Sequence, residues 1–554
     1  MTTGSLPGAL PADGDLKQLF RLNYTEAALS SAIFTLGMAG SVFMIGFALA
    51  LGATPVQIGL LTSLPFFASV VQVAGSYLME RYRTTKGLCI VTYNLFHVMW
   101  ALTIAAPLVI FRGTLADYRL AGLMAGIFLI SMAQALLNVS WMAWNAQVVP
   151  EGVRGRFFGN RNVIAGLCGM GVALAAGRFL DFWGAGYPDA DAALPYAIIF
   201  GIAIVFGLLA VLALRRVPDA PTFEAPDEAF LVRLARPVQD QNFRNFIFFG
   251  MAWGFASGLA APFFTVFMLQ ELSMTFSLIA LLGLMSGVAN MGGMMAWGRL
   301  TDAVGPKPLL LICSGMAGLL TAVWVVLTPE NVWLLWPLLF LNGWFWSGIG
   351  LCSISLLMGL VGSQRGGSYF AIFAAAAGVS TAVAPIAGGY LVAGLSAWEL
   401  SLYGFAPGPL PVLFLVAGLM RLATLPFLLR VEAPAKIPLQ DLLRHVRNMK
   451  RFQTGIMPAW GGGIGALENL NIALATGAVV MEAAVERTAE RTTRAGRAVG
   501  QALFRVDAGI ERRVGVWEAF IARAIDRVIP FIRAVIQWLR NDDGPPRDRE
   551  GGNR

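Results

Sequence analysis

Four polar or aromatic side chains recur at helical spacing inside one long apolar stretch of this chain. Gln134, Asn138, Trp141 and Asn145 stand four, three and four residues apart, so an α-helix places all four on one stripe. Amides form hydrogen bonds without carrying charge, and an indole ring offers a flat apolar wall. Because every amide in lipid requires a partner, the stripe either lines a wet cavity that binds a solute or forms hydrogen bonds to other helices.

Two further apolar stretches carry the same residue types. Asn342, Trp346 and Ser353 share a helical face, and Trp253 stands four residues before Ser257. Indoles combined with amides and hydroxyls suit a sugar-like or aromatic solute, because the ring packs against the solute and the polar groups fix its orientation. We therefore predict that these five residues also line a solute cavity.

Ionisable groups are scarce in the apolar stretches. His97, three residues after Asn94, is either a proton relay or a neutral imidazole hydrogen-bonded between helices. Arg421 either binds an anionic group of the solute or extends toward the membrane surface. All three join the cavity candidates. No carboxylate falls inside the spans given below, and Glu26 precedes the first of them. Since buried carboxylates commonly carry protons or cations, this pattern favours a neutral or zwitterionic solute.

The composition requires a membrane. Hydrophobic residues make up 57% of the chain and charged residues 13%, and the mean hydropathy is +0.67. A helix of about 20 apolar residues crosses a bilayer. We predict twelve such helices, near 28–52, 55–79, 88–111, 121–147, 162–180, 194–214, 246–269, 274–298, 308–328, 333–360, 369–394 and 409–429. The fold class is therefore all-α and polytopic. We predict no enzyme and no cofactor or metal, because the spans hold no Cys or His cluster, phosphate-binding loop or paired carboxylates.

Basic residues divide unevenly between the predicted loops. Alternate loops hold almost all the Lys and Arg of the twelve-span region, including Arg81, Arg215 and Arg244, whereas the others hold few. The basic loops are cytoplasmic by the positive-inside rule, which places both termini there. The net charge of +8 then reflects topology and a basic tail rather than nucleic-acid binding. We expect an integral protein of the cytoplasmic (inner) or plasma membrane, inserted by its first span without a signal peptide.

Between two predicted spans lies the decapeptide GRLTDAVGPK, residues 298–307. Gly298, Leu300, Asp302, Gly305 and Lys307 match Gly-x-Leu-x-Asp-x-x-Gly-x-Lys/Arg, the signature loop of the major facilitator superfamily, which this chain resembles. The resemblance implies a twelve-helix transporter whose two bundles open alternately to either side, with spans one, four, seven and ten around the solute. It also implies that Asp302 latches the halves on the cytoplasmic side, against the start of the fifth span. The alternative is a loop shaped only by topology.

The two halves of the sequence echo each other. Arg154 and Arg365 each open an Arg-Gly pair, and each stands 23 residues before a glycine, Gly177 or Gly388. Two bundles that arose by duplication would keep the same number of residues between such corresponding positions. The first-half counterpart of the signature loop is degenerate, with Glu80 one residue later than the superfamily pattern. Glu80, Arg154 and Arg365 join the signature residues as gating candidates. We predict a first six-helix bundle over 1–214, a cytoplasmic linker over 215–245, a second, pseudo-symmetric bundle over 246–430 and a basic amphipathic helical tail over 431–554.

The predicted tail carries two amphipathic patterns. Residues 438–452 place apolar side chains on one face and basic ones elsewhere, which is typical of a helix on an anionic lipid surface. Between 499 and 539, apolar residues recur every eleven positions, so one side of a nearly straight helix stays apolar. That side either lies on lipid or packs against a protein partner or a second copy.

Two functions fit these patterns. The first is secondary active or facilitative transport of a small organic solute by alternating access. The second is a membrane scaffold or receptor of the same fold that does not transport, and whose tail recruits a partner or binds the membrane surface. The signature loop and the amide stripe favour transport, whereas the periodic tail and the degenerate counterpart loop favour the scaffold.

Overall fold

The structure is a computed structural model that describes residues 13–72, 75, 78, 85–106, 117–150, 153–187, 191–217, 239–361, 366–396 and 408–432. The chain divides into two compact units, Met1–Asn448 and Met449–Arg554, and the described residues all belong to the first. The amphipathic segments predicted at 438–452 and 499–539 lie outside the described residues, as does most of the predicted linker over 215–245.

Helices account for nearly all of the described residues, and no strand occurs among them. The first half comprises α1 (Asp13–Gly37), α2 (Val42–Ala50), α3 (Pro55–Ala68), α5 (Lys86–Ala105), α6 (Arg119–Val148), α7 (Arg154–Gly186) and α8 (Leu194–Arg215). The second half comprises α10 (Gln241–Gly258), α11 (Phe263–Gln270), α12 (Phe276–Val304), α13 (Pro306–Ala322), the 3-10 segments η5 (Val323–Val326) and η6 (Pro329–Leu334), α14 (Leu335–Val361), α15 (Gly366–Leu395), α16 (Pro409–Ala423) and α17 (Leu425–Leu429). The prediction of an all-α protein is confirmed.

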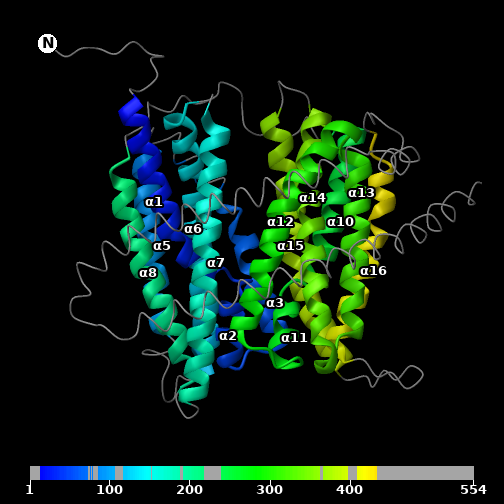
Figure 1. Cartoon of the computed structure of the whole chain (residues 1–554), viewed down its shortest axis with the longest axis horizontal. Helices are drawn as coiled ribbons and strands as arrows, with labels where there is room; N and C mark the ends of the chain where they lie inside the picture. The colour runs from blue at the N-terminus through cyan, green and yellow to red at the C-terminus, as the bar shows by residue number, and fades with distance from the viewer. Residues whose placement is uncertain are drawn as a thin grey trace, which may run out of the picture. The chain divides into compact units, whose positions relative to one another are not determined.

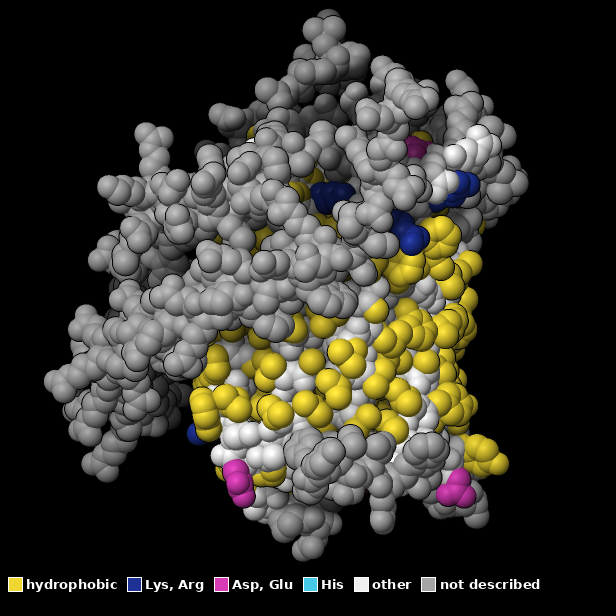
Figure 2. Space-filling view, turned by 90° about the vertical axis from the view of Figure 1, so that its right-hand side faces the viewer, with side chains coloured by type: hydrophobic (Ala, Val, Ile, Leu, Met, Phe, Trp, Pro, Cys, Tyr) yellow, Lys and Arg dark blue, Asp and Glu magenta, His cyan; other side chains and the backbone are white. Residues whose placement is uncertain are grey.

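Most of these helices can cross a membrane. Ten are long and apolar enough, and α1 with α2, bent by 41°, adds an eleventh if the pair is one span. The helix α3 has only 14 residues, and the predicted span 55–79 continues beyond it into residues that are described only in part. The described residues therefore account for ten or eleven of the twelve predicted spans. Figure 2 shows a broad apolar band on one side, with most visible Lys and Arg side chains near its upper end.

Local sequence determines where several helices begin. Thr54 and Gln57 form a capping box at the start of α3, in which each side chain bonds the other residue's backbone N–H. Asp240 caps α10 and Thr275 caps α12 by accepting hydrogen bonds from backbone N–H groups of the first turn. Gly305 separates α12 from α13 with φ 98° and ψ 160°, a conformation essentially restricted to glycine.

The helix contacts repeat between the two halves. In the first half, α1 packs on α7 and α8, α6 packs on α3 and α5, and α5 packs on α8. In the second half, α10 packs on α15 and α16, α14 packs on α12 and α13, and α13 packs on α16. Each pair of the second half thus corresponds to a pair of the first half, six spans earlier. The halves are joined mainly by α3 with α15 and by α7 with α12, and α2 also contacts α11 (Figure 1). This is the pattern that two related bundles produce.

Large aromatic side chains fill the space between the helices. The main apolar core includes Phe47 and Trp100 in the first half and Phe267 and Phe414 in the second, each at most 2% exposed. A smaller core lies wholly within the second half around Phe246. The polar clusters described below lie among these packed helices.

Candidate functional site

The first span begins earlier than predicted and contains a carboxylate. The helix α1 begins at Asp13, and its membrane-length part begins at Gln18, so Glu26 lies well inside it. The Glu26 side chain is buried, with 2% of the residue exposed. The prediction that no carboxylate lies within a span is therefore wrong. It failed because the polar residues Asn23 and Glu26 end the apolar run in the sequence, although both face the packed interior.

Two other helices supply the groups that bind this carboxylate. The Tyr93 hydroxyl, from α5, donates a hydrogen bond to Glu26 Oε1 at 3.0 Å. The Arg161 guanidinium, from α7, donates to Glu26 Oε2 at 2.9 Å. A buried carboxylate needs such partners because it has lost its water. Arg161 also escaped prediction: the fifth span was expected to begin at 162, whereas α7 begins at Arg154.

The arginine links this ion pair to the predicted amide stripe. The Arg161 guanidinium lies over the ring of Trp141, from α6, at 4.2 Å from the ring centroid, within the range of a cation–π interaction. The Arg161 side chain remains 16% exposed, whereas that of Glu26 is 3% exposed. Trp141 is half-buried, and its indole nitrogen has no hydrogen-bond partner among the described residues. Arg161 Nε is likewise buried without a partner in the described part of the chain, so this contact holds unused hydrogen-bond donors.

The other members of the stripe differ in exposure. Asn145 is buried, and its amide donates to the Trp141 carbonyl at 2.9 Å within the same helix. Asn138 is exposed and Gln134 is half-buried. The four residues share one side of α6 as the spacing predicts. Only Trp141 is brought into the ring and ion-pair cluster with α7, so the role of the amides in a cavity stays a prediction.

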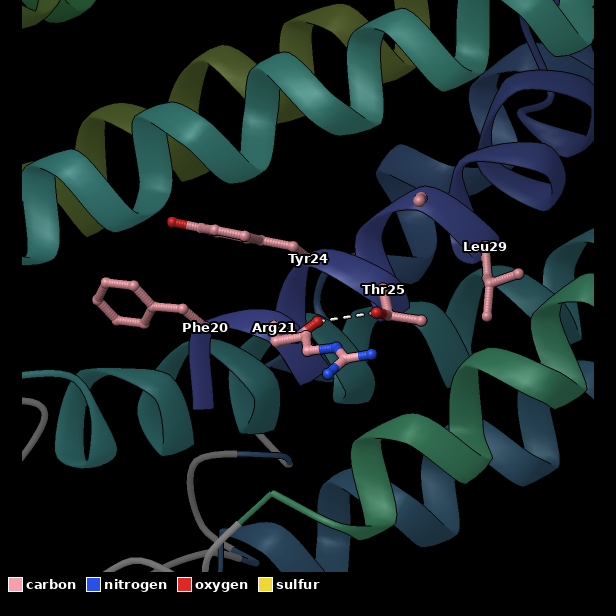
Figure 3. A pocket seen from close by; sticks show the side chains of 6 residues that line it. Phe20, Arg21, Tyr24, Thr25 and Leu29 are labelled. Carbon is pink, nitrogen blue, oxygen red and sulfur yellow. Dashed lines mark hydrogen bonds between the residues drawn. The ribbon is translucent and has the colours of Figure 1, made fainter. Parts of the chain in front are cut away.

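A cavity of about 590 Å³ lies along one face of α1 (Figure 3). Its lining consists of Phe20, Arg21, Tyr24, Thr25, Ala28 and Leu29. The Tyr24 ring stacks on Phe157 at the start of α7, with ring centroids 5.8 Å apart. Arg21 and Thr25 are exposed, and their α-helical spacing was the one signal in the sequence that could have indicated this face.

Four predicted residues meet in the second half. Trp253 and Ser257 lie on α10, Trp346 on α14 and Arg421 on α16. The Arg421 guanidinium lies 5.9 Å from the centroid of the Trp253 ring and 5.7 Å from that of Trp346, and the two ring centroids are 6.0 Å apart. Arg421 also donates to the Ser257 carbonyl at 3.4 Å and to the Thr321 hydroxyl. The sequence spacing within single helices did not reveal this meeting of three spans.

Arg421 is held by indole rings and neutral hydrogen-bond acceptors. It is only 3% exposed, which rules out a side chain extended to the membrane surface. Among the described residues no carboxylate pairs with it, and its Nε has no hydrogen-bond partner. The buried hydroxyl of Ser257 also lacks a partner within the described part of the chain. Burying an unpaired charge is costly, so this cluster is suited to receive an anionic group.

The remaining cavity candidates differ in their surroundings, and His97 lies beside Tyr93 of the Glu26 cluster, with ring centroids 5.0 Å apart. His97 is buried, with Nδ1 2.8 Å from the Tyr93 carbonyl, and it packs closely against Gly207 of α8. Asn94 donates to the Ile90 carbonyl at 2.7 Å, within α5. Asn342 and Ser353, on α14, are both half-buried.

The signature residues join the end of α12 to the start of α13. Gly298 and Leu300 belong to the last turns of α12, and Asp302 is exposed there. Lys307 Nζ donates to the Leu429 carbonyl at 3.0 Å, which fixes the loop to α17 of the same half. Arg154, at the start of α7, donates from Nε to the Val149 carbonyl at 3.0 Å. The gating candidates Glu80 and Arg365 lie outside the described residues.

A known protein family and several solved structures resemble this chain. The family model described as Major Facilitator Superfamily matches residues 246–485. A mutant of the nucleoside transporter NupG superposes with a TM-score of 0.58 at 12% identity, over 76% of this chain and 100% of that one. The second half of the chain thus matches the Major Facilitator Superfamily, and the chain is similar in fold to a transporter of known structure. A D-xylose–proton symporter superposes with a TM-score of 0.56 at 16% identity, over 74% and 97% of the two chains. No curated protein sequence matches the chain.

A third structure extends the fold comparison. A bacterial homologue of the iron transporter ferroportin superposes with a TM-score of 0.53 at 14% identity, over 76% of this chain and 99% of that one. At such identities the likeness establishes the fold alone. With ten or eleven helices long and apolar enough to cross a bilayer, the described residues form an integral membrane protein of this fold.

Proposed function

We propose that this chain is a Major Facilitator Superfamily transporter that moves a small organic solute with a sugar-like or aromatic ring by alternating access. The observation that carries the proposal is a pair of arginine–tryptophan contacts, one in each half: Arg161 over Trp141, and Arg421 beside Trp253 and Trp346. Indole rings provide flat walls for a ring-shaped solute, and guanidinium groups bind its oxygen atoms. A solute held between such contacts bridges the halves, so their relative movement would carry it across.

We further propose that the Glu26–Arg161 ion pair couples transport to protons. Protonation of Glu26 removes the charge that holds Arg161 at 2.9 Å and leaves the guanidinium free to engage the solute. Deprotonation restores the pair and releases the solute. The sequence left active and facilitative transport open, and the buried Glu26 carboxylate supports the active one.

The solute charge admits two candidates. The Trp141 ring beside the Arg161 guanidinium, which is a hydrogen-bond donor to neutral oxygens as well as anionic ones, supports the neutral or zwitterionic solute that the sequence favours. Arg421 has no carboxylate partner among the described residues, and this specific observation supports an anionic solute as the second candidate. The two candidates differ in whether a carboxylate or phosphate on the solute is required for binding.

The scaffold function remains the alternative from another class. It rests on the tail pattern at 499–539, which lies beyond the described residues, and on the degenerate loop near Glu80. A partner captured by the tail, together with no binding of any solute, would support the scaffold. The exposed arginine–indole contact in the first half supports transport instead.

The test begins with a thermal-melting screen of the detergent-solubilised full chain. Neutral, zwitterionic and anionic solutes with sugar-like or aromatic rings are compared, because a bound solute raises the melting temperature without any assay of flux. Solutes that stabilise the protein are then tested for uptake into proteoliposomes, with Asn138→Ala and Asp302→Asn as variants of the proposed cavity and signature loop. If uptake exists and neither substitution alters it, the proposed mechanism is wrong.

A further inference from the structure

A carboxylate of the first half binds the beginning of a helix in the second half. Asp181, near the end of α7, accepts hydrogen bonds from the backbone N–H groups of Phe276 at 2.8 Å and Ser277 at 2.9 Å. These are the first two residues of α12, so the carboxylate lies at the positive end of the helix dipole. Hydrogen bonds to an ionised acceptor are among the strongest that proteins form.

The side chain of Phe276 fits into a socket in the first half. Its ring stacks on Phe43 with centroids 6.3 Å apart and meets the edge of the Tyr196 ring at 6.0 Å. A Cβ added at Gly46 would lie 2.9 Å from the Phe276 ring, and one added at Gly177 would lie 2.9 Å from the Phe276 carbonyl carbon. Two glycines are therefore required for this close approach.

The contact is at one end of the interface between the halves. It involves the end of α7 and the start of α12, whereas the signature loop follows the other end of α12. The second joint between the halves lies at the same end: a Cβ added at Gly389 of α15 would lie 2.7 Å from the Pro55 carbonyl oxygen at the start of α3. The halves are thus closed together on the face opposite the signature loop.

We propose that Asp181 and the Phe276 socket form a latch that keeps the transporter closed on this face and must release for the solute site to open there. The inference rests on the proposed alternating access. Asp302 is expected to stabilise the state closed on the cytoplasmic side, and Asp181 with the Phe276 socket would stabilise the state closed on the opposite side. Each end of α12 then carries one gate. Asp181 bonds the start of α12 from the first half, and Asp302 belongs to the end of α12.

The test uses hydrogen–deuterium exchange of the full chain in lipid nanodiscs, which requires no solute. In Asp181→Asn the neutral amide is a weaker acceptor, so exchange at the first amides of α12 should rise about tenfold or more. Exchange around 298–307 should fall, because opening one face closes the other. Asp191→Asn is the matched control: Asp191 accepts from the Ala193 N–H at 3.0 Å within the first half, so neither segment should change.

A second pair of variants keeps the test valid if Asp181→Asn does not fold. Gly177→Ala should force the socket apart and give the same reciprocal change, whereas Gly184→Ala, whose added Cβ meets no atom within 4 Å, should not. Unchanged exchange in both Asp181→Asn and Gly177→Ala overturns the latch. A rise at the start of α12 without a fall at 298–307 shows a fixed structural joint and also overturns it. Because no flux is measured, failure to find a transported solute would count against the proposed function and leave the latch standing.

Discussion

Arg161 and Glu26 form an ion pair between α7 and α1, with 2.9 Å between the guanidinium nitrogen and the carboxylate oxygen. The pair joins two helices of the first half that pack along much of their length. Its other neighbours are the Tyr93 hydroxyl, which bonds Glu26, and the Trp141 ring, over which Arg161 lies. A change in the charge of Glu26 therefore changes the electrostatic surroundings of the Arg161 guanidinium and the Trp141 ring.

We expect Glu26→Gln to reduce the free energy of unfolding by about 2–4 kcal/mol, because it leaves Arg161 without its counter-charge among packed helices. Chemical unfolding in detergent measures the change. The double variant Glu26→Gln with Arg161→Gln should lose less stability than the sum of the single variants, since residues in direct contact are coupled. Strict additivity of the two losses would show that the pair does not contribute as proposed.

The same Glu26→Gln change should uncouple transport from protons. A glutamine cannot bind and release a proton at this position, so an inward proton gradient should no longer drive accumulation of the solute, while exchange of labelled for unlabelled solute continues. Uptake into proteoliposomes with and without an imposed pH gradient measures both. Accumulation that still follows the gradient in this variant would contradict the coupling.

Arg421→Met should separate a solute-binding arginine from a structural one. Methionine fills similar volume without a charge, so stability should stay equal or rise, because an unpaired buried charge is removed. If the solute is anionic, its affinity should fall at least about tenfold. Arg430→Met, at an exposed position after α17, is the matched control and should leave both quantities unchanged. Loss of stability with unchanged solute affinity would assign Arg421 a purely structural role.

Gly305→Ala should destabilise the protein by about 1–3 kcal/mol, because φ 98° with ψ 160° is strained for any residue with a Cβ. Gly298→Ala is the control: it lies within α12, and its added Cβ would make an ordinary contact with Leu351 at 3.8 Å. This control should be neutral or slightly stabilising, since alanine favours helices over glycine. Equal melting temperatures for both variants would show that the loop tolerates a side chain at 305.

The sequence predicted the fold well because bilayer physics leaves a strong signal. Long apolar runs indicated the helices, and Gly298, Asp302 and Gly305 indicated the superfamily loop. Glu26 and Arg161 were missed for one reason. Span limits were placed where the apolar runs end, whereas α1 and α7 continue past those points because charged residues pair across helices there. Arg421, Trp253 and Trp346 were each singled out by residue type, but their meeting depends on the packing of α10, α14 and α16.

The central claim is that a solute binds against the arginine–indole contact in the first half and moves as the halves alternate. The most direct measurement is solute counterflow in proteoliposomes, with Trp141→Ala compared with Trp333→Ala, a 63% exposed tryptophan at a span end. Removing the Trp141 ring should raise the half-saturating solute concentration about tenfold or more, because the solute loses an aromatic wall, and Trp333→Ala should behave as wild type. Equal counterflow by both variants and the wild type would contradict the account.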